Sequence, residues 1–360
     1  MEKLKILTLG AGAIGTYIGG SLALAGNRVV FVEQAQAAEE LAGRGLRLDL
    51  TISRGEVVTI RDSSLSFTSS IEQALDQGPF DVAIYALKSY DTAAALDAIR
   101  PFATQLPPFL CLSNGVDNEG SLASVLGVQK VIAGTVTSSV GRRAVGDIVL
   151  ERERGVGLAD GHPLSLLLAE ALRAAGLKTG LFQHPDDMKW SKMLTNLPAN
   201  ATSAILDMTA ADVFAHAGLF RLEMRILRET LAVMRAYHLH TVNLPGVPVQ
   251  ALGLGTRLPE FLARPLMLKA VGGGRGDKMP SFHIDLHSGR GRSEVEWLNG
   301  AVARYGMRAG VATPVNQLLY VTLLALTSGK IPLAEFDHQP VKLLSLLSTQ
   351  GQKETTRDLK

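Results

Sequence analysis

The sequence contains a single cysteine, almost no net charge and no long apolar run. Cys111 is the one cysteine among 360 residues, which excludes an internal disulfide and a cluster of thiolate metal ligands, and its apolar neighbours in residues 109–112 predict a place in the core. Lysine and arginine number 36 against 34 aspartate and glutamate, and no basic run is interleaved with aromatic residues. We therefore assign no metal site and expect no nucleic acid partner.

No apolar stretch is long enough to cross a bilayer. Residues 1–5 lead directly into a strand pattern, without the apolar segment of a signal peptide. We therefore expect a cytoplasmic protein with no membrane partner. With 46% hydrophobic residues and 36 glycines, a chain of this length is expected to be globular and to form two domains.

The N-terminal residues carry the pattern of a dinucleotide-binding βαβ unit. A strand pattern over residues 3–9 runs into a glycine turn, and a helical pattern then leads to a second strand at residues 28–32. In such a unit Gly10 makes the tight turn, Gly12 lets the backbone approach a pyrophosphate, and Gly15 lets helix and strand pack closely. A purely structural glycine turn is the alternative. We assign cofactor binding to Gly10, Ala11, Gly12, Ala13, Ile14 and Gly15.

The second strand ends at Glu33. An acidic side chain at this position accepts hydrogen bonds from the hydroxyls of the adenosine ribose. A carboxylate there would also repel a 2′-phosphate. Glu33 is therefore assigned to the cofactor site, and by itself it favours NADH over NADPH.

Two further strand patterns end in polar loops. Residues 81–87 end at Lys88, and residues 109–112 lead to Asn114 in an Asn-Gly turn. Ligands of open α/β sheets bind beyond the carboxyl ends of the parallel strands, so both side chains are candidates for contact with cofactor or substrate. A surface lysine and an ordinary turn residue are the alternatives.

The other β segments carry no evident chemistry. Alternating patterns over residues 46–67 predict a short antiparallel excursion, residues 131–134 predict a fourth strand, and residues 135–140 predict a hairpin with residues 147–151. Together with the glycine motif they predict an α/β fold whose N-terminal domain is of the Rossmann type.

Helical patterns dominate after residues 183–185, where we place the domain boundary. The predicted domains are a Rossmann-type cofactor-binding domain at residues 1–183, a mainly α-helical substrate and catalytic domain at residues 184–335, and a C-terminal tail at residues 336–360. Helices of the second domain are expected at residues 187–204, 211–236, 259–270, 293–309 and 316–327.

The helix predicted at residues 187–204 carries Lys192, Asn196 and Asn200 at spacings of four, and so on one face. An ammonium and two carboxamides in an otherwise apolar segment point to a bound ligand, whereas the alternative is the solvated face of an amphipathic helix. Pro198 lies between the asparagines and removes a helical hydrogen bond, so the face that they share is expected to be disturbed.

A second polar segment lies near the start of a predicted helix. Ser293 and Glu296 have the spacing of a capping box. Glu294 then lies in the first helical turn, where a carboxylate also interacts favourably with the helix dipole. A structural role for Glu294 is therefore an alternative to a role at a ligand site.

These segments resemble the ketopantoate reductase (2-dehydropantoate 2-reductase) family over nearly the whole chain. The resemblance rests on five segments in order, residues 10–15, 87–92, 113–119, 190–200 and 293–300. It implies an NADPH-dependent reduction of the ketone of 2-dehydropantoate, a 2-keto acid, to (R)-pantoate. That product is a precursor of pantothenate and coenzyme A.

The resemblance also implies roles for individual residues. The residues that match the family's site are Lys192 (catalytic lysine), Asn196 and Asn200 (substrate), Lys88 and Asn114 (near cofactor and substrate), Ser281 (substrate carboxylate) and Glu294 (active-site glutamate). Hydride addition to a ketone builds alkoxide charge, which a nearby ammonium can neutralise and protonate. Lys192 would therefore be the general acid.

Two departures from the family bear on ligand choice. Lys278 stands three residues before Ser281, where family members commonly carry asparagine, and Glu33 with Gln34 stands where NADPH-using members commonly carry arginine. The family thus implies NADPH, whereas Glu33 favours NADH. A reductase of another 2-keto or hydroxy acid and a non-catalytic dinucleotide-binding regulator are the alternative functions. The apolar helical domain is compatible with a homodimer.

Overall fold

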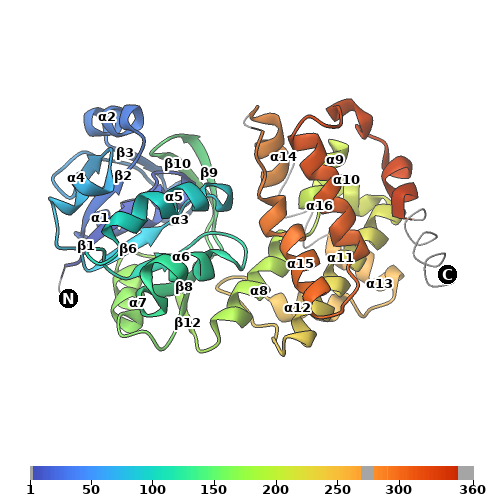
Figure 1. Cartoon of the computed structure of the whole chain (residues 1–360). Coiled ribbons are helices and arrows are strands. Elements are labelled where there is room, and N and C mark those ends of the chain that lie inside the picture. Colours follow the sequence, from blue (N-terminus) through green and yellow to red (C-terminus); the bar gives the residue numbers. More distant parts are fainter. Residues whose placement is uncertain (1–2, 269–278, 290, 348–360) are drawn as a thin grey trace. The chain divides into compact units, whose positions relative to one another are not determined.

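The computed structural model describes residues 3–268, 279–289 and 291–347, and its contacts divide into two compact units. The first unit contains Met1–Lys189 with Asn243–Val247, and the second contains Trp190–Val242 with Pro248–Lys360. The strands lie in the blue to green part of the chain together with several helices, whereas the yellow to red part is helical (Figure 1). The division falls inside helix α8 (Pro185–Asn196), a few residues after the predicted boundary.

The first unit is built on an eight-stranded sheet with the order β12-β11-β8-β7-β6-β1-β2-β5. All neighbouring pairs are parallel except β11 with β8. The six strands from β5 to β8 have the order of a doubly wound dinucleotide-binding sheet, with its switch point between β1 and β6. The strands are β1 (Lys5–Leu9), β2 (Arg28–Val32), β5 (Leu65–Thr68), β6 (Val82–Tyr85), β7 (Phe109–Cys111), β8 (Val131–Val136), β11 (Val156–Ala159) and β12 (Thr179–Phe182).

Helices cover both faces of this sheet, because its central strands are apolar on both sides. One core packs the sheet against α1 (Ala13–Leu24) and α7 (Ser165–Ala174). The other packs it against α4 (Ile71–Leu75), α5 (Thr92–Ile99) and α6 (Asn118–Leu126). Cys111 lies in this second core with no exposed surface, as predicted. The prediction of an α/β fold with a Rossmann-type first domain is confirmed.

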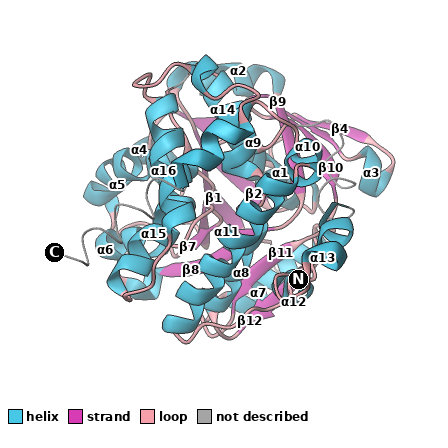
Figure 2. Ribbon diagram, turned by 90° about the vertical axis from the view of Figure 1, so that its right-hand side faces the viewer, coloured by secondary structure: helices cyan, strands magenta, loops and turns pink. Residues whose placement is uncertain are grey.

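A four-stranded sheet, β4-β3-β10-β9, covers the outer side of α1. Figure 2 shows α1 between β2 of the large sheet and β10 of the small one. The antiparallel excursion predicted at residues 46–67 is therefore partly wrong, since β5 joins the large sheet. The hairpin predicted from residue 135 starts later, because residues 131–136 form β8. The remaining elements of this unit are β3 (Leu46–Asp49), β4 (Val57–Ile60), β9 (Ser139–Ala144), β10 (Asp147–Arg152), α2 (Ala35–Arg44), α3 (Thr51–Arg54), η1 (Ser89–Asp91), η2 (Arg100–Phe102) and η3 (Val128–Lys130).

The regular elements of the second unit are all helices among its described residues, and loops join them. The helix predicted at residues 187–204 is two helices, α8 and α9. The helix predicted from residue 293 starts at Asn299, after the 3-10 turn η5 (Glu294–Trp297), in which the Ser293 hydroxyl accepts the Val295 N–H. The other elements are α9 (Asn200–Leu206), α10 (Ala210–Ala215), α11 (Ala217–Ala236), α12 (Val249–Gly255), α13 (Glu260–Met267), α14 (Ser281–His287), α15 (Asn299–Arg308), α16 (Pro314–Thr327), η6 (Leu333–Glu335) and a helix at residues 340–347.

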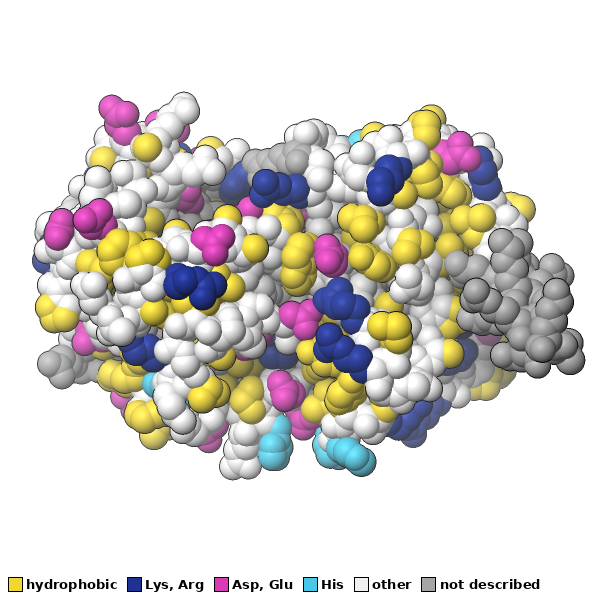
Figure 3. Space-filling view, viewed as in Figure 1, with side chains coloured by type: hydrophobic (Ala, Val, Ile, Leu, Met, Phe, Trp, Pro, Cys, Tyr) yellow, Lys and Arg dark blue, Asp and Glu magenta, His cyan; other side chains and the backbone are white. Residues whose placement is uncertain are grey.

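The surface gives two further observations. Among the described residues, no helix combines the length and the apolar character that a membrane crossing requires. On the face shown in Figure 3, lysine and arginine side chains lie in small groups among acidic and apolar side chains.

The burial of α1 between two sheets generates a prediction. Gly19→Ala would place a Cβ 2.6 Å from the Phe31 ring, so we expect it to lower the free energy of unfolding by about 1–3 kcal/mol through overpacking. Gly43→Ala in α2 is the control, because its Cβ would meet nothing within 4 Å and alanine favours a helix. Thermal and urea unfolding of both variants is the measurement. A Gly19→Ala protein as stable as Gly43→Ala would contradict the tight packing.

Candidate functional site

The glycine loop between β1 and α1 has a separate steric requirement at each glycine. Gly10 has a φ of +92°, and a Cβ there would lie 2.6 Å from Leu87 Cδ2, two residues after the end of the neighbouring strand β6. A Cβ on Gly15 would lie 1.9 Å from the Gly10 carbonyl oxygen, so only glycine allows the helix to start so close to the strand. Above Gly12, by contrast, a Cβ would meet nothing within 4 Å.

The open space at Gly12 lies at the start of α1. Gly12 is the N-cap of this helix, and no side chain of the described residues caps it. The first amides of a helix lack carbonyl partners within it and attract anions such as phosphate. Ala11, Ala13 and Ile14 complete the loop without adding a charged or bulky polar group. The loop therefore fits the pyrophosphate of a dinucleotide at the switch point of the sheet.

Glu33 is fixed to this loop. One of its carboxylate oxygens accepts the Ala11 N–H at 2.5 Å, and the other accepts the N–H of Gln34 at 3.2 Å. The carboxylate therefore lies beside the glycine loop at the end of β2, and its remaining lone pairs can accept further hydrogen bonds.

The loops after β6 and β7 are held together by a buried hydrogen-bond network. Asn118 Nδ2 donates to the Asn114 carbonyl oxygen at 2.7 Å and to Ser89 Oγ at 3.0 Å, and Ser89 Oγ donates to the same carbonyl. Ser113 Oγ donates to the Leu87 carbonyl oxygen at 2.7 Å. These bonds join residues 87 and 89, on either side of the half-buried Lys88, to the loop that contains Asn114. Both residues thus lie where the strands deliver them, at the carboxyl edge of the sheet.

A buried lysine that the sequence analysis did not single out supports the same loops. Lys189, 4% exposed, donates to the Ser113 carbonyl oxygen at 2.7 Å and pairs with Glu119 at 2.7 Å. Burial alone would lower the pKa of Lys189, but the negative charge of Glu119, which also accepts a hydrogen bond from the ammonium, outweighs it, so the pKa lies above its ordinary value. The lysine is therefore charged at neutral pH. It braces the loop that carries Asn114.

The polar stripe of the second unit is divided by a turn. Lys192 and Asn196 lie on α8, four residues apart and both half-buried, whereas Asn200 is the first residue of α9. Pro198 and Ala199, whose φ is +54°, end one helix before the other begins. The prediction that all three side chains share one helix is wrong, because a proline inside a helix removes a hydrogen bond and clashes with the preceding turn.

The turn is held by a buried carboxylate on α11 that the sequence analysis also missed. Glu223 has no exposed surface, and it accepts the Ala199 N–H at 2.7 Å and the Thr202 hydroxyl at 2.5 Å. A non-glycine residue with positive φ is strained and persists only where its surroundings hold it. The position of Glu223 four residues from Leu219 and Leu227, on the buried stripe of α11, is the signal that could have identified it.

Asn200 and Ser281 meet in the structure. Asn200 Nδ2 donates to the Asn196 carbonyl oxygen at 3.1 Å and lies 3.3 Å from Ser281 Oγ, and its Oδ1 accepts the Phe282 N–H at 3.0 Å. The amide of Asn200 thus links the end of α8 to the start of α14. Ser281 is exposed and Asn200 is buried, so the serine is the more accessible of the two.

Glu294 is buried in η5, which packs against α15 and α16. Lys278, the residue that departs from the family before Ser281, lies outside the described residues. The structure therefore brings together Asn196, Asn200 and Ser281 in the second unit, and the glycine loop, Glu33, Lys88 and Asn114 at one edge of the sheet in the first.

The Glu223 interaction generates a prediction. Glu223→Gln keeps the shape but removes the charge from both hydrogen bonds, so we expect a loss of about 1.5–3 kcal/mol in the free energy of unfolding. Glu260→Gln is the matched control, since Glu260 is exposed and pairs only loosely with Arg221 at 3.5 Å. Urea unfolding followed by circular dichroism is the measurement. Equal stability of the two variants would show that the carboxylate does not hold the turn.

Two family profiles match the chain. The one described as ketopantoate reductase PanE/ApbA matches residues 6–161, and the one described as ketopantoate reductase PanE/ApbA C terminal matches residues 186–327. The 2-dehydropantoate 2-reductase of Archaeoglobus fulgidus is 26% identical over 91% of this chain and 100% of its own length. That of Pyrococcus horikoshii is 26% identical over 89% of this chain and 97% of its own.

Solved structures give the same fold. The PanE/ApbA family ketopantoate reductase of Ralstonia eutropha JMP134 superposes with a TM-score of 0.75 at 24% identity, covering 91% of this chain and 99% of that one. D-mandelate dehydrogenase, solved with NADH and anilino(oxo)acetate, has a TM-score of 0.74 at 21% identity with the same coverage. The two profiles cover most of the sequence, and they confirm the resemblance drawn from its motifs. The chain belongs to the ketopantoate reductase family of NAD(P)-dependent oxidoreductases.

Proposed function

We propose that this protein is a 2-dehydropantoate 2-reductase, which reduces 2-dehydropantoate to (R)-pantoate with NAD(P)H. The observation that carries the proposal is the pair of Lys192 and Asn196 on one face of α8, followed across the turn by Asn200 and Ser281. The pair gives one proton donor and one carboxamide, and Ser281 adds an accessible hydroxyl. Curated relatives of this activity match over nearly their full length, which supports the same assignment.

Lys192 acts as the general acid. When bound, the reduced nicotinamide supplies the hydride that adds to the carbonyl carbon of the keto acid. Negative charge then builds on the carbonyl oxygen, and a positioned ammonium stabilises it and transfers a proton to it. Lys192 is half-buried on α8, so its charge acts in a medium less polar than bulk water.

The remaining residues orient the keto acid. Asn196, one turn from Lys192 on α8, offers a donor and an acceptor to the substrate's oxygens. The exposed Ser281 hydroxyl donates to the substrate carboxylate. Asn200 acts through Ser281, because its side chain already bonds the start of α14. Glu294 and Asn114 complete the assignment on the strength of the family resemblance, and Lys88 serves the cofactor.

A related 2-keto acid is the second candidate substrate. Two observations favour it: Lys278 stands where family members commonly carry asparagine, and the fold superposes almost equally well on D-mandelate dehydrogenase. A lysine three residues before Ser281 in the sequence would favour an acid with a second anionic group. A site shaped for an aromatic acid would favour the 2-keto acid of mandelate instead.

The role of Lys192 generates a prediction. We expect Lys192→Ala to lower kcat by about 100-fold or more, with cofactor affinity nearly unchanged. In the unaltered protein, we expect 2-dehydropantoate to be turned over faster than pyruvate, 2-ketoisovalerate or phenylglyoxylate. The measurements are ketone-dependent oxidation of NADH and NADPH and a cofactor titration by fluorescence. Lys178→Ala, at an exposed lysine, is the control. An unchanged kcat in Lys192→Ala would contradict the assignment of Lys192 as the general acid. Faster turnover of phenylglyoxylate than of 2-dehydropantoate would contradict the proposed substrate.

We propose NADH as the preferred cofactor. The Glu33 carboxylate is held beside the glycine loop by the Ala11 N–H, in the place where the adenosine ribose of a dinucleotide binds. It accepts hydrogen bonds from ribose hydroxyls and repels a 2′-phosphate. Gln34, the next residue, offers no positive charge to offset the repulsion.

This electrostatic argument generates a prediction. We expect kcat/KM for NADH to exceed that for NADPH by about tenfold or more, because facing like charges cost several kcal/mol in a binding site. Glu33→Gln is expected to reduce the difference, mainly by improving KM for NADPH. Glu39→Gln on α2 is the control, since it removes the same charge at an exposed position. A preference for NADPH in the unaltered protein would refute the argument.

A further inference from the structure

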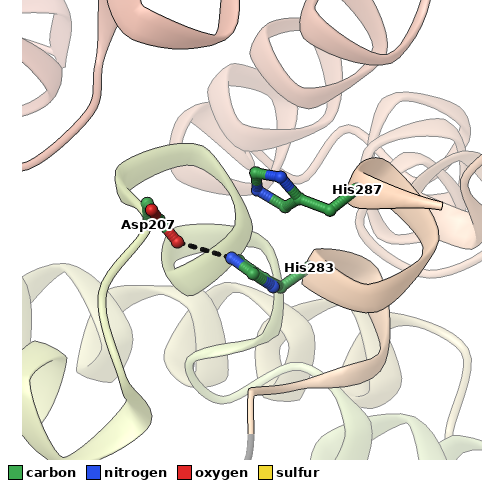
Figure 4. A group of neighbouring side chains, drawn as sticks. All are labelled: Asp207, His283 and His287. Atoms are coloured by element: carbon green, nitrogen blue, oxygen red, sulfur yellow. Dashed lines mark hydrogen bonds and ion pairs between the residues drawn. The ribbon is translucent and has the colours of Figure 1, made fainter. Parts of the chain in front are cut away.

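A cluster of histidine and aspartate side chains lies on the second unit, on the same two helices, α9 and α14, that carry Asn200 and Ser281. His283 and His287 are four residues apart on α14, and so they share one face of that helix. Asp207 faces them from the C-terminal end of α9. Figure 4 shows both imidazoles projecting from the same helix toward the carboxylate.

The donor atoms of these three side chains are close together. His283 Nε2 lies 2.5 Å from Asp207 Oδ1, and the two imidazole rings lie 4.1 Å apart between centroids. One ligand atom from each residue lies within 4.8 Å of the others. In a tetrahedral zinc site with bonds of about 2.0–2.1 Å, ligand atoms are about 3.4 Å apart. Side-chain rotations alone can therefore bring the three donors to metal-binding distances.

The backbone fixes Asp207 in this position. Asp207 has a left-handed backbone with a φ of +48°, and so does His338, whose φ is +49°. The His338 N–H donates to the Leu206 carbonyl oxygen at 2.9 Å, which holds the segment after η6 against the end of α9. Asp207, Asp337 and His338 form a second group of donors within 4.8 Å, and Asp207 belongs to both groups. Four other potential ligands thus lie close to the Asp207 carboxylate.

The electrostatics keep that carboxylate ionised. The hydrogen bond from His283 lowers the pKa of Asp207 below its ordinary value. A charged carboxylate with two neutral imidazoles is a donor set typical of zinc and other divalent transition metals, whereas Mg²⁺ and Ca²⁺ prefer oxygen ligands alone. The His283 side chain is 14% exposed and that of Asp207 is 45% exposed, so an ion can reach the cluster from solvent.

We propose that Asp207, His283 and His287 form a binding site for a divalent transition metal ion such as Zn²⁺, with water, Asp337 or His338 as the further ligand. The site lies where α9 and α14 meet. It adds a metal ion to a chain whose single cysteine excludes a thiolate site. Two histidines at i and i+4 on one helix face are a frequent pair of zinc ligands, and here a third ligand comes from another element.

The ion would clamp α9 to α14. Asn200 at the start of α9 already bonds Ser281 and the Phe282 N–H at the start of α14, and the metal would join Asp207 at the end of α9 to the same helix. Both ends of α9 would then be attached to α14, which carries Ser281. Metal binding is therefore expected to lower KM for the keto acid, and this last consequence rests on the proposed function.

The binding test uses the full chain without a histidine tag. Co²⁺ is titrated at pH 7.5 and followed by its visible absorption, and Zn²⁺ is titrated by calorimetry. We expect one ion per chain, with affinity lowered at least about tenfold in His287→Ala and in Asp207→Asn and unchanged in His184→Ala, an exposed histidine of the first unit.

The outcomes separate the site from the proposed function. No binding, or equal binding in unaltered protein and His287→Ala, overturns the metal site whatever the enzyme reduces. A Zn²⁺-dependent rise in Tm that is lost in His287→Ala supports the site even if no keto acid is turned over. If the protein reduces 2-dehydropantoate, a KM that Zn²⁺ lowers in the unaltered protein but not in His287→Ala supports the link between α9 and α14. A KM that Zn²⁺ leaves unchanged in both proteins contradicts that link.

Discussion

The carboxylate of Glu223 is the constraint on which the arrangement of the helical unit depends. It holds the Ala199 N–H in a left-handed turn and the Thr202 hydroxyl in the first turn of α9, with no exposed surface of its own. A buried charge is costly unless it is fully hydrogen-bonded, so this residue specifies one backbone path. That path moves Asn200 off the helix of Lys192 and onto the start of α9, where its amide meets Ser281. The geometry of the proposed substrate site thus follows from a side chain that takes no part in the chemistry.

The first unit uses buried polar groups in the same way. Lys189 and Glu119 form an ion pair beneath the loop of Asn114, and Asn118 joins that loop to the turn after Lys88. Lys189 and Asn118 donate to the backbone carbonyls of Ser113 and Asn114 at the carboxyl edge of the sheet, so these carbonyls are paired. The glycine loop is shaped differently, by the absence of side chains: the carbonyl of Gly10 fills the space that a Cβ of Gly15 would need. Rigid support of this kind lets loop residues be positioned for catalysis.

The sequence was sufficient where the signal is local. The strand, glycine turn and helix at the N-terminus, the buried Cys111 and the helical second unit follow from periodicity and glycine spacing. It was insufficient where the partner is distant: Glu223 acts on Ala199 from 24 positions away, and Lys189 acts on Ser113 across 76. The identity of a charged residue on a helix does not tell whether its side chain is exposed or buried. Only its position on the apolar stripe of the helix distinguishes a buried charged residue from an exposed one. Pro198 was recognised as a disturbance, but whether a proline bends a helix or ends it depends on what holds the freed amides.

Cys111 has a consequence for work on this protein in solution. It lies in the core without exposed surface, and burial raises the pKa of its thiol well above the usual range, so the reactive thiolate is scarce while the first unit is folded. The folded protein should react only slowly with thiol reagents. The rate of that slow modification of Cys111 should then report how often the core of the sheet opens. A cysteine introduced at any exposed position would then be the single site for a fluorescent or spin label, with no need to remove the natural one.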